Sequence, residues 1–560
     1  MVLALSTEAA ERGSNRTRKD RCLVAVLSLL PAVIFLWLST VRLDAQGLYY
    51  DELHQAAGAF AYLGSPPEYF ALFTIHGIPL LNMPYSGAIK TAVYGLYLRF
   101  VRPHFGVLSW RLVGIFFVAA GLTAFTLLAR SCLSPLPLAV ILGLLLTDVT
   151  VLLCSRHDWG PVALALTLRL VSIGMWLRGE GRGQVSLGNS LALGGLLGFA
   201  VFEKLSSWVM IIALGWMLLS DGRRTGKHFL AAVGGVLAGA LPLVMINLTS
   251  LVVQGKLISL TDMGTASDRS WLAFLQYAWE YIGLGAGEQV REFILGSSAP
   301  PIVRTLEPWL MMVAVMLTGW IAVFSRFREP AARLALMAIG CYVSIGAVLY
   351  LFPRKTWIHH WVLGTPFHYV AIGLGLESLE RVQADIAGFL LRVVVGVLLV
   401  VRLVGGVSLE QALWRGEAAL SWHPSLTQLG RFAANRADEA VFIAADWGVA
   451  TQIYCLSNGR PGLVQQAFWS YRGPEDLLRL QQQSGMKVLY AVSLNPTSGV
   501  MPETTQRILR DLENSSHWRE TAVEPAASNL TAVTVRKFLY DPPPGGADQR
   551  AWKLTMKSQE

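Results

Sequence analysis

Charged residues are scarce in this sequence. Asp, Glu, Lys and Arg make up only 15% of its 560 residues, whereas hydrophobic residues make up 53%. Soluble domains carry about 25% charged residues, and a chain of this length exceeds what one globular core accommodates. The scarcity of charge therefore excludes a water-soluble globular protein and indicates that most of the chain is buried in lipid.

Cysteine is also scarce, and the sequence has no CxxC pair and no repeat of fixed period. Most of the five cysteines lie within or at the ends of apolar runs. That distribution excludes a disulfide framework and a cysteine zinc site. The net charge of +9 comes without a basic stripe or a nucleic-acid-reading motif, so we expect no nucleic-acid partner. Many Lys and Arg lie in short gaps between apolar runs, where anionic membrane lipids are their expected partners.

Long apolar runs dominate the sequence instead. About eleven of them are long enough to cross a bilayer as helices. They cover residues 22–41, 107–129, 137–154, 159–177, 187–201, 205–220, 229–251, 308–325, 334–352, 362–377 and 386–405. The predicted fold class is a polytopic α-helical membrane protein with about eleven transmembrane helices.

The distribution of basic residues predicts the orientation. The N-terminal segment 1–21 is basic, and no small-residue cleavage site closes the first apolar run, so we expect a retained helix with its N-terminus in the cytoplasm. The basic gaps at alternate turns share that side. Eleven crossings then place the C-terminus outside, in a multi-pass protein of the plasma or inner membrane.

Composition divides the chain into three predicted parts. A cytoplasmic segment, 1–21, precedes a transmembrane catalytic domain, 22–405, with long outer loops at 42–106 and 252–307. After residue 405 charges return, and β-rich runs at 440–444, 487–492 and 530–540 alternate with helical stretches at 475–484 and 502–513. We therefore predict an extracytoplasmic α/β domain over 406–560. Within it, Asp446-Trp447-Gly448 follows a strand and is either a strand-end turn or part of an acceptor groove.

The first candidate site is Asp51-Glu52, just past the outer end of the first helix. If the segment is helical, Asp51, His54 and Gln55 share one face. Two adjacent acids beside a membrane are costly to desolvate and are often catalytic or ion-binding. A solvated loop with an N-cap acid explains the same residues equally well.

Two further candidates lie at outer turns. Arg156-His157-Asp158 precedes Pro161, which is the pattern of a helix N-cap followed by an early proline. The same turn also carries a guanidinium, an imidazole and a carboxylate to the outer face. Glu203-Lys204 lies at the tip of a short hairpin, where Lys204 either snorkels or binds a lipid phosphate as a point charge.

The fourth candidate is the last short outer loop with the start of the next helix. Its residues of interest are Arg354, Lys355, His359, His360, His368 and Tyr369. We expect no metal here, because the rings of the adjacent His359 and His360 should point apart and no carboxylate has zinc-ligand spacing. An anion site built on Arg354 and Lys355, with aromatic neighbours for a sugar or a prenyl chain, fits better.

The predicted topology places all four candidates on the outer face. A sugar on a polyprenyl phosphate suits such a set of one or two carboxylates and several cations, because its phosphate leaves without protonation. One carboxylate can then deprotonate an acceptor hydroxyl while cations stabilise the phosphate, and the anomeric carbon inverts. A glycosidase would need two opposed carboxylates.

These motifs together resemble the GT-C glycosyltransferases. The similarity rests on Tyr50-Asp51-Glu52, Arg156-His157-Asp158, Phe202-Glu203-Lys204 and His360…Pro366…His368-Tyr369, in that order. The branch most similar is that of the protein mannosyltransferases and aminoarabinose transferases. The resemblance covers roughly residues 20–405 and matches the C-terminal domain only loosely.

The resemblance implies a role for each motif. Asp51 is the expected catalytic base, and Glu52 and Asp158 are expected to place acceptor or donor. Around the donor phosphate or substrate it implies Arg156, His157, Lys204, Arg354, Lys355, His360, His368 and Tyr369. The implied donor is an undecaprenyl- or dolichyl-phosphate sugar, and the acceptor is a protein, lipid or glycan. No cofactor and no divalent metal is required.

Two alternatives to an enzyme remain open. A secondary transporter is typically built from internal repeats and carries ionisable residues near the bilayer midplane. Here no repeat is evident, and the ionisable clusters are expected at the ends of the apolar runs and in outer loops. A non-catalytic cell-envelope assembly protein would use the same carboxylates only as helix caps.

Overall fold

The structure is a computed structural model that describes residues 18–65, 68–181, 183, 186–219, 224–259, 270–324, 329–352, 356–379 and 386–541. It divides into two compact units. We call the first the membrane unit; it holds residues up to Ala45 together with 70–94 and 107–419. The second, the C-terminal unit, holds residues 46–69, 95–106 and those from Leu420 onward. Residues 46–69 of the long first loop thus pack with the end of the chain.

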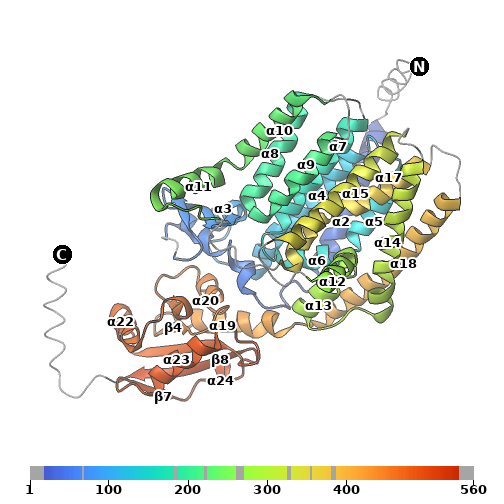
Figure 1. Ribbon diagram of the computed structural model, residues 1–560. Helices are drawn as coiled ribbons and strands as arrows, with labels where there is room; N and C mark the ends of the chain where they lie inside the picture. The colour runs from blue at the N-terminus through green and yellow to red at the C-terminus, as the bar shows by residue number, and fades with distance from the viewer. Residues whose placement is uncertain are drawn as a thin grey trace. The chain divides into compact units, whose positions relative to one another are not determined.

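Helices make up almost all of the membrane unit, and each of the predicted apolar runs is helical. The corresponding helices are α2 (Arg18–Thr40), α4 (Val107–Ala129), α5 (Pro135–Leu146), α6 (Val149–His157), α7 (Ala163–Gly181), α8 (Leu187–Glu203), α9 (Met210–Leu219), α10 (Gly226–Gly239), α11 (Leu241–Gln254), α14 (Pro301–Phe324), α15 (Pro330–Leu351), α17 (Phe367–Leu379) and α18 (Ile386–Arg415). Figure 1 shows them as a layered bundle.

Among the described residues, four helices are long and apolar enough to cross a bilayer: α4, α14, α15 and α18. The number rises to six if the bent pairs α5–α6 (59°) and α10–α11 (71°) each count as one span. Asp148 caps α6 at the first bend by accepting the N–H of Val151 (2.8 Å). Pro242 lies in the first turn of α11 at the second bend, where its missing N–H costs nothing. The polytopic helical fold is confirmed, and eleven crossings stay a prediction.

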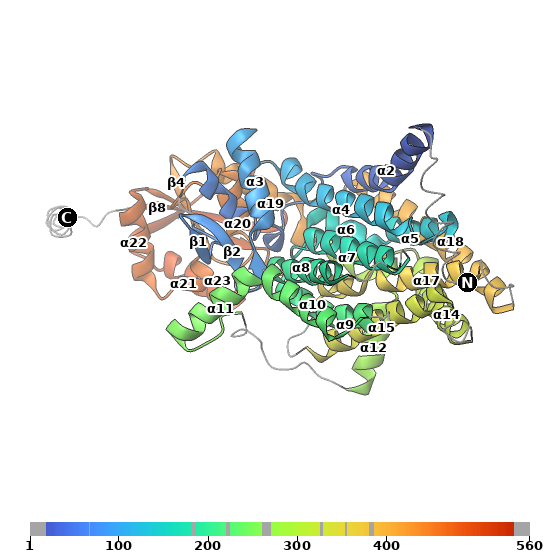
Figure 2. The same ribbon diagram turned by 90° about the horizontal axis from the view of Figure 1, so that it is seen from above.

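Helices α8 and α10 pack backbone against backbone and lie side by side in Figure 1 and Figure 2. Gly194 and Gly198 of α8 face Gly235 and Gly239 of α10. A Cβ atom on any of the four would overlap a carbonyl oxygen of the partner helix. Small residues at this spacing are typical of close helix contacts in membranes. Helix α8, whose C-cap is Lys204, is therefore held against α10 by a close backbone contact that glycines make possible.

The long loops contain short elements. The first has the 3-10 helices η1 (Tyr50–Leu53) and η2 (Ala57–Leu63), an antiparallel sheet of β1 (Phe73–Ile75), β2 (Ile78–Met83) and β3 (Ser86–Gly87), and α3 (Ile89–Phe100). The second has α12 (Trp271–Ile282), η4 (Leu284–Ala286) and α13 (Glu288–Leu295). The 3-10 helix η3 (Leu205–Val209) precedes α9. The short helix α16 (Ile358–Trp361) and the 3-10 helix η5 (Val362–Gly364) precede α17.

The C-terminal unit has a five-stranded sheet in the order β5-β4-β6-β8-β7. Its strands are β4 (Ala440–Ala444), β5 (Val464–Gln465), β6 (Val488–Leu494), β7 (Trp518–Thr521) and β8 (Val533–Tyr540). Strands β5, β4 and β6 are parallel, and β8 is antiparallel to β6 and β7. The predicted strands at 440–444, 487–492 and 530–540 are confirmed.

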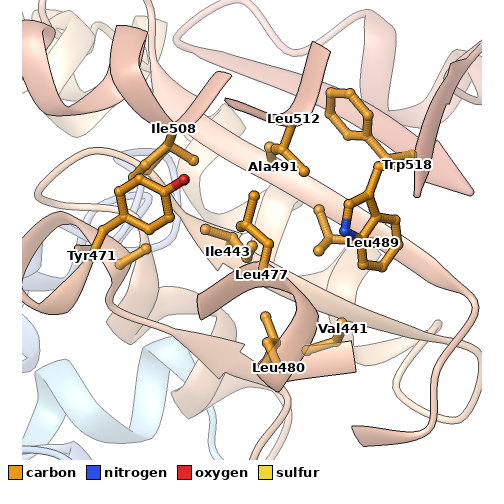
Figure 3. Close-up of a cluster of buried hydrophobic side chains, with 13 residues drawn as sticks. Val441, Ile443, Tyr471, Leu477, Leu480, Leu489, Ala491, Ile508, Leu512 and Trp518 are labelled. Carbon is orange, nitrogen blue, oxygen red and sulfur yellow. The ribbon is translucent and has the colours of Figure 1, made fainter. Parts of the chain in front are cut away.

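Helices cover this sheet. They are α19 (Pro424–Ala434), α20 (Ala450–Leu456), α21 (Ala467–Ser470), α22 (Pro474–Ser484), α23 (Pro502–Glu513) and α24 (Pro525–Ser528), with η6 (Leu420–Trp422) before them. Figure 3 shows Leu477 of α22 and Leu512 of α23 beside Ile443 and Leu489 of the sheet, in one buried cluster. On the opposite face the Phe442 and Tyr490 rings stack with centroids 5.0 Å apart. Alternation along the strands thus supplies apolar side chains to both layers.

Candidate functional site

The turn after α6 holds Asp158 with two partners. Asp158 has a left-handed backbone (φ 49°) and is the C-cap of α6. Its Oδ1 accepts the N–H of Ala163 (2.7 Å), which begins α7, and its Oδ2 lies 2.8 Å from Lys90 Nζ. The predicted N-cap backbone for Asp158 is therefore wrong, because the chain turns through a left-handed residue here. Its side chain nevertheless satisfies one N–H at the start of α7.

Lys90 is the partner that sequence analysis missed. The side chains of Lys90 and Asp158 are only 1% and 4% exposed, and the ammonium lies 3.8 Å above the Trp110 ring. A Cβ on Gly114 would lie 3.2 Å from Asp158 Cβ, so glycine leaves the room that the pair occupies. Buried charges are tolerated only when they are paired in this way. The available signal was a lysine at the start of a mostly apolar helix whose other charged residue, Arg99, lies in its last turn.

Lys204 lies against the same turn. It is the C-cap of α8, and its Nζ donates to the carbonyl oxygens of Gly160 and His359, the latter at 3.4 Å. The backbone beside it is fixed, since Leu205 N–H donates to the carbonyl of Tyr85 (2.9 Å). The tip of the hairpin and the Asp158 turn, predicted separately, are thus brought together.

Glu203 has a different partner from its neighbour. Its Oε2 accepts the backbone N–H of Ile89 (3.2 Å), the first residue of α3. A carboxylate at a helix N-terminus is favourable because of the unpaired N–H groups and the helix dipole there. Glu203 therefore fixes the start of the helix that carries Lys90.

The two adjacent histidines lie on α16, and His359 contacts the turn that follows Asp158. The His359 ring lies beside Gly160 and 4.8 Å from the Trp159 ring. The His359 and His360 ring centroids are only 4.1 Å apart, so the expectation that they point apart is wrong. A helical turn, with His360 Nδ1 accepting the N–H of Trp357 (3.2 Å), brings them side by side. Arg354 and Lys355 lie outside the described residues.

Arg156 and His157 are buried on the last turn of α6. The Arg156 guanidinium donates to the carbonyl oxygens of Ser39 (2.8 Å) and Arg42 (2.7 Å). Both carbonyls lie at the end of α2, where a cation stabilises the unpaired C=O groups. The observed contacts of Arg156 are thus with backbone, and its part in substrate binding stays a prediction.

His368 and Tyr369 belong to a second cluster, inside the helices. Tyr369 Oη donates to Asp148 Oδ2 (2.6 Å), and the His368 ring lies 4.4 Å from that of Tyr342. Arg402 of α18 lies 4.8 Å from the Tyr369 ring and 2.5 Å from Glu307 of α14. We expected ionisable residues only at the ends of the apolar runs and in outer loops. That expectation is wrong, because Asp148 and Arg402 lie within runs. The signal was available, because Arg402 falls within the run 386–405.

Asp51, Glu52 and His54 lie in the C-terminal unit, on or next to η1. His54 Nε2 is 3.3 Å from Asp51 Oδ1, which confirms that these two residues share a face. The Asp51 side chain is 24% exposed, whereas Glu52 is buried beside Cys455. Burial, assisted by Glu52, raises the pKa of that thiol. The two adjacent acids thus have different surroundings, and Asp51 is the accessible one.

His54 is a neutral partner for Asp51 near pH 7. Burial lowers the pKa of His54 below its ordinary value of 6.5, and the Asp51 carboxylate opposes this only in part. The imidazole packs edge-on against the Tyr50 ring, with centroids 5.2 Å apart. Asp51 therefore faces a neutral imidazole near pH 7.

A metal centre would need several ligands close together. Over the described parts of the chain, no three His, Cys, Asp or Glu side chains are close enough to hold an ion.

Comparison of the sequence with protein-family models gives no match, and comparison with curated proteins gives none either. The structure is similar to ArnT from Cupriavidus metallidurans in the apo state, with a TM-score of 0.58 at 16% identity. It is also similar to the same protein bound to undecaprenyl phosphate, with a TM-score of 0.57 at 14% identity. Both matches cover 91% of this chain and 97% of the other.

These matches show that the chain shares the fold of ArnT, and the predicted similarity of fold is therefore confirmed. The likeness is also wider than the sequence motifs indicated. A coverage of 91% extends well past residues 20–405 and includes much of the C-terminal unit.

Proposed function

We propose that this chain is a glycosyltransferase that moves a sugar from a polyprenyl-phosphate-linked donor to an acceptor hydroxyl or amide at the outer face of the membrane. One observation carries the proposal: the fold matches ArnT over 91% of the chain, and one of the matched structures holds undecaprenyl phosphate. The acceptor is a protein, lipid or glycan. The catalytic domain is 22–405, and 1–21 lies in the cytoplasm with 406–560 outside.

The buried cations of the membrane unit support a donor phosphate site. Lys90, Lys204 and Asp158 lie around one turn and carry a net charge of +1. Lys90 pairs with the Asp158 carboxylate, and Lys204 Nζ donates to the carbonyl oxygens of Gly160 and His359. An ammonium acts on phosphate as a point charge, and its effect is strong where water is excluded. In this site the cations stabilise the polyprenyl phosphate as it leaves. Asp158 holds Lys90 in place.

Asp51 serves as the general base on the acceptor. It takes the proton of the acceptor hydroxyl while the acceptor oxygen bonds to the anomeric carbon. The bond from that carbon to the phosphate oxygen breaks in the same displacement, so the configuration inverts. Such a base contributes about 10²- to 10⁴-fold in rate. No cofactor or metal enters this sequence of steps.

The test is transfer from a panel of radiolabelled polyprenyl-phosphate sugars by the full-length chain in membranes. Asp51→Asn keeps the size of the side chain and removes the base, so we expect transfer to fall about 100-fold or more. Asp44→Asn is the matched control, because Asp44 is an exposed acid just past α2. It should transfer at the wild-type rate.

Two outcomes would contradict the proposal. Wild-type transfer by a folded Asp51→Asn variant would remove Asp51 from its role and make Asp158 the next candidate for the base. Absence of transfer from every donor, by wild-type protein shown to be intact, would overturn the enzyme assignment. The transport hypothesis would then be tested by uptake into proteoliposomes.

A further inference from the structure

The segment that leads to Asp51 is hydrogen bonded to the C-terminal part of its unit. Gly47 N–H donates to the carbonyl of Trp422 (2.6 Å), and Leu48 N–H donates to Thr427 Oγ1 (3.1 Å). The carbonyl of Leu48 accepts from Gln452 Nε2 (2.9 Å). Both backbone groups of a residue three positions before Asp51 are therefore satisfied by side chains of α19 and α20.

Packing restrains the same segment. A Cβ on Gly47 would overlap the carbonyl oxygen of His423, so only glycine allows this approach. The Tyr49 and Trp422 ring centroids are 4.8 Å apart, and those of Tyr50 and Trp447 are 4.4 Å apart. Two consecutive tyrosines immediately before Asp51 are thus each held against a tryptophan.

Gln452 also fixes the loop that carries Trp447. Its amide nitrogen donates to the carbonyl of Gly448 (2.7 Å) as well as to Leu48, which uses both of its N–H groups. Asp446 holds the other side of this loop, accepting the N–H groups of Trp447 and Met501 (both 2.8 Å). The turn after β4 is therefore hydrogen bonded on both sides and linked to Leu48 by one buried amide.

We infer that Thr427 and Gln452 are positioning residues for the catalytic base. They hold Leu48, and through it η1, so that the Asp51 carboxylate is presented in one orientation. The inference rests on the proposed function and deepens it. A general base acts only within hydrogen-bond distance of the proton it removes, and a displacement of about 1 Å can cost about 100-fold in rate. The C-terminal unit is then part of the catalytic apparatus.

The test compares matched variants of the full-length chain in proteoliposomes. Thr427→Val removes the hydroxyl and keeps the shape, whereas Thr427→Ser keeps the hydroxyl. Gln452→Met removes the amide, and Gln452→Glu places an oxygen against two carbonyls. We expect Thr427→Val and both Gln452 variants to lower kcat about tenfold or more, with Thr427→Ser close to wild type. Binding of undecaprenyl phosphate and the KM for the donor should stay within about twofold, because the interaction lost acts in the transition state.

A second readout separates positioning from general structural damage. In an Asp51→Asn background there is no base to position, so adding Thr427→Val should cause no further loss of the residual rate. A further loss of similar size would overturn the inference, as would wild-type kcat in folded Thr427→Val and Gln452→Met. If Gln452→Met fails to fold, the comparison of Thr427→Val with Thr427→Ser is sufficient to test the inference.

Failure of the proposed function gives a different result. No transfer by the wild type would overturn both proposals. Loss of transfer in Asp51→Asn alone, with both positioning variants active, would overturn only this inference.

Discussion

The buried Lys90–Asp158 ion pair makes the stability of the folded chain depend on both of its residues. Removing one partner leaves the other charge buried without compensation, which typically costs about 3–5 kcal/mol. We therefore expect Lys90→Met to lower the Tm of the detergent-solubilised protein strongly. The double variant Lys90→Met/Asp158→Asn should recover part of the loss, because it removes both charges while asparagine tolerates the left-handed backbone and still accepts the N–H of Ala163. A double variant no more stable than Lys90→Met would contradict this account.

His54 predicts a dependence of stability on pH. Its pKa in the folded chain is lowered from 6.5 by burial, so the folded state binds the proton more weakly than the unfolded state. The sign follows from linkage: the stability contribution is complete above pH 6.5 and falls as the pH drops below that value. His54→Gln does not titrate, and its Tm should fall less than that of the wild type between pH 7.5 and 5.5. Equal falls in Tm for the wild type and His54→Gln would exclude His54 as a cause of the pH dependence.

At the scale of elements, the glycine contact between α8 and α10 predicts a contrast between adjacent positions. A methyl group on Gly235 would overlap the carbonyl oxygen of Leu191, whereas nothing lies within 4 Å of a Cβ on Gly234. Gly235→Ala should therefore destabilise by about 1–3 kcal/mol, since the helices must move apart. Gly234→Ala should be neutral or slightly stabilising, because alanine favours helix by about 1 kcal/mol. Thermal unfolding of the two variants measures the difference.

The bend between α5 and α6 depends on Asp148 in a similar way. Its Oδ1 caps α6, and its Oδ2 accepts from Tyr369. Asp148→Ala removes the cap of α6 and leaves the Tyr369 hydroxyl without its acceptor. We therefore expect the free energy of unfolding to fall by about 2–4 kcal/mol. Asp148→Asn keeps an acceptor for the cap and should lose less. Equal Tm values for the two variants would rule out capping as the main role.

Patterns within single elements predicted much of the fold. Hydropathy identified every helix of the apolar runs, and alternation identified strands such as 440–444, because both depend only on local spacing. The 59° and 71° bends were not predicted, since they depend on neighbouring helices. The Lys90–Asp158 pair was missed for the same reason. Asp51 and His54 were paired correctly because they are three residues apart in a helical turn.

For the molecule as a whole, residues from Leu420 onward supply a packing surface for residues 46–69 within the C-terminal unit. Leu48, Tyr50 and Phe60 are buried, and the Phe60 ring packs edge-on against Tyr454 at 5.6 Å. A chain that ends at Ala419 would expose these apolar side chains. Limited proteolysis should then cut within residues 46–69 of the truncated chain and leave that segment intact in the full chain. Equal resistance in both chains would show that the segment folds without its partner.

The hydrogen bond between Leu48 and Gln452 joins residues 404 positions apart. A ribosome adds about 5–20 residues per second, so the segment that carries Asp51 waits about 20–80 seconds for the helix that holds it. Unfinished or prematurely terminated chains therefore lack the contacts that hold Leu48 and the segment that carries Asp51. Under the proposed function, transfer would begin only on chains whose synthesis is complete, and truncated products would be inactive.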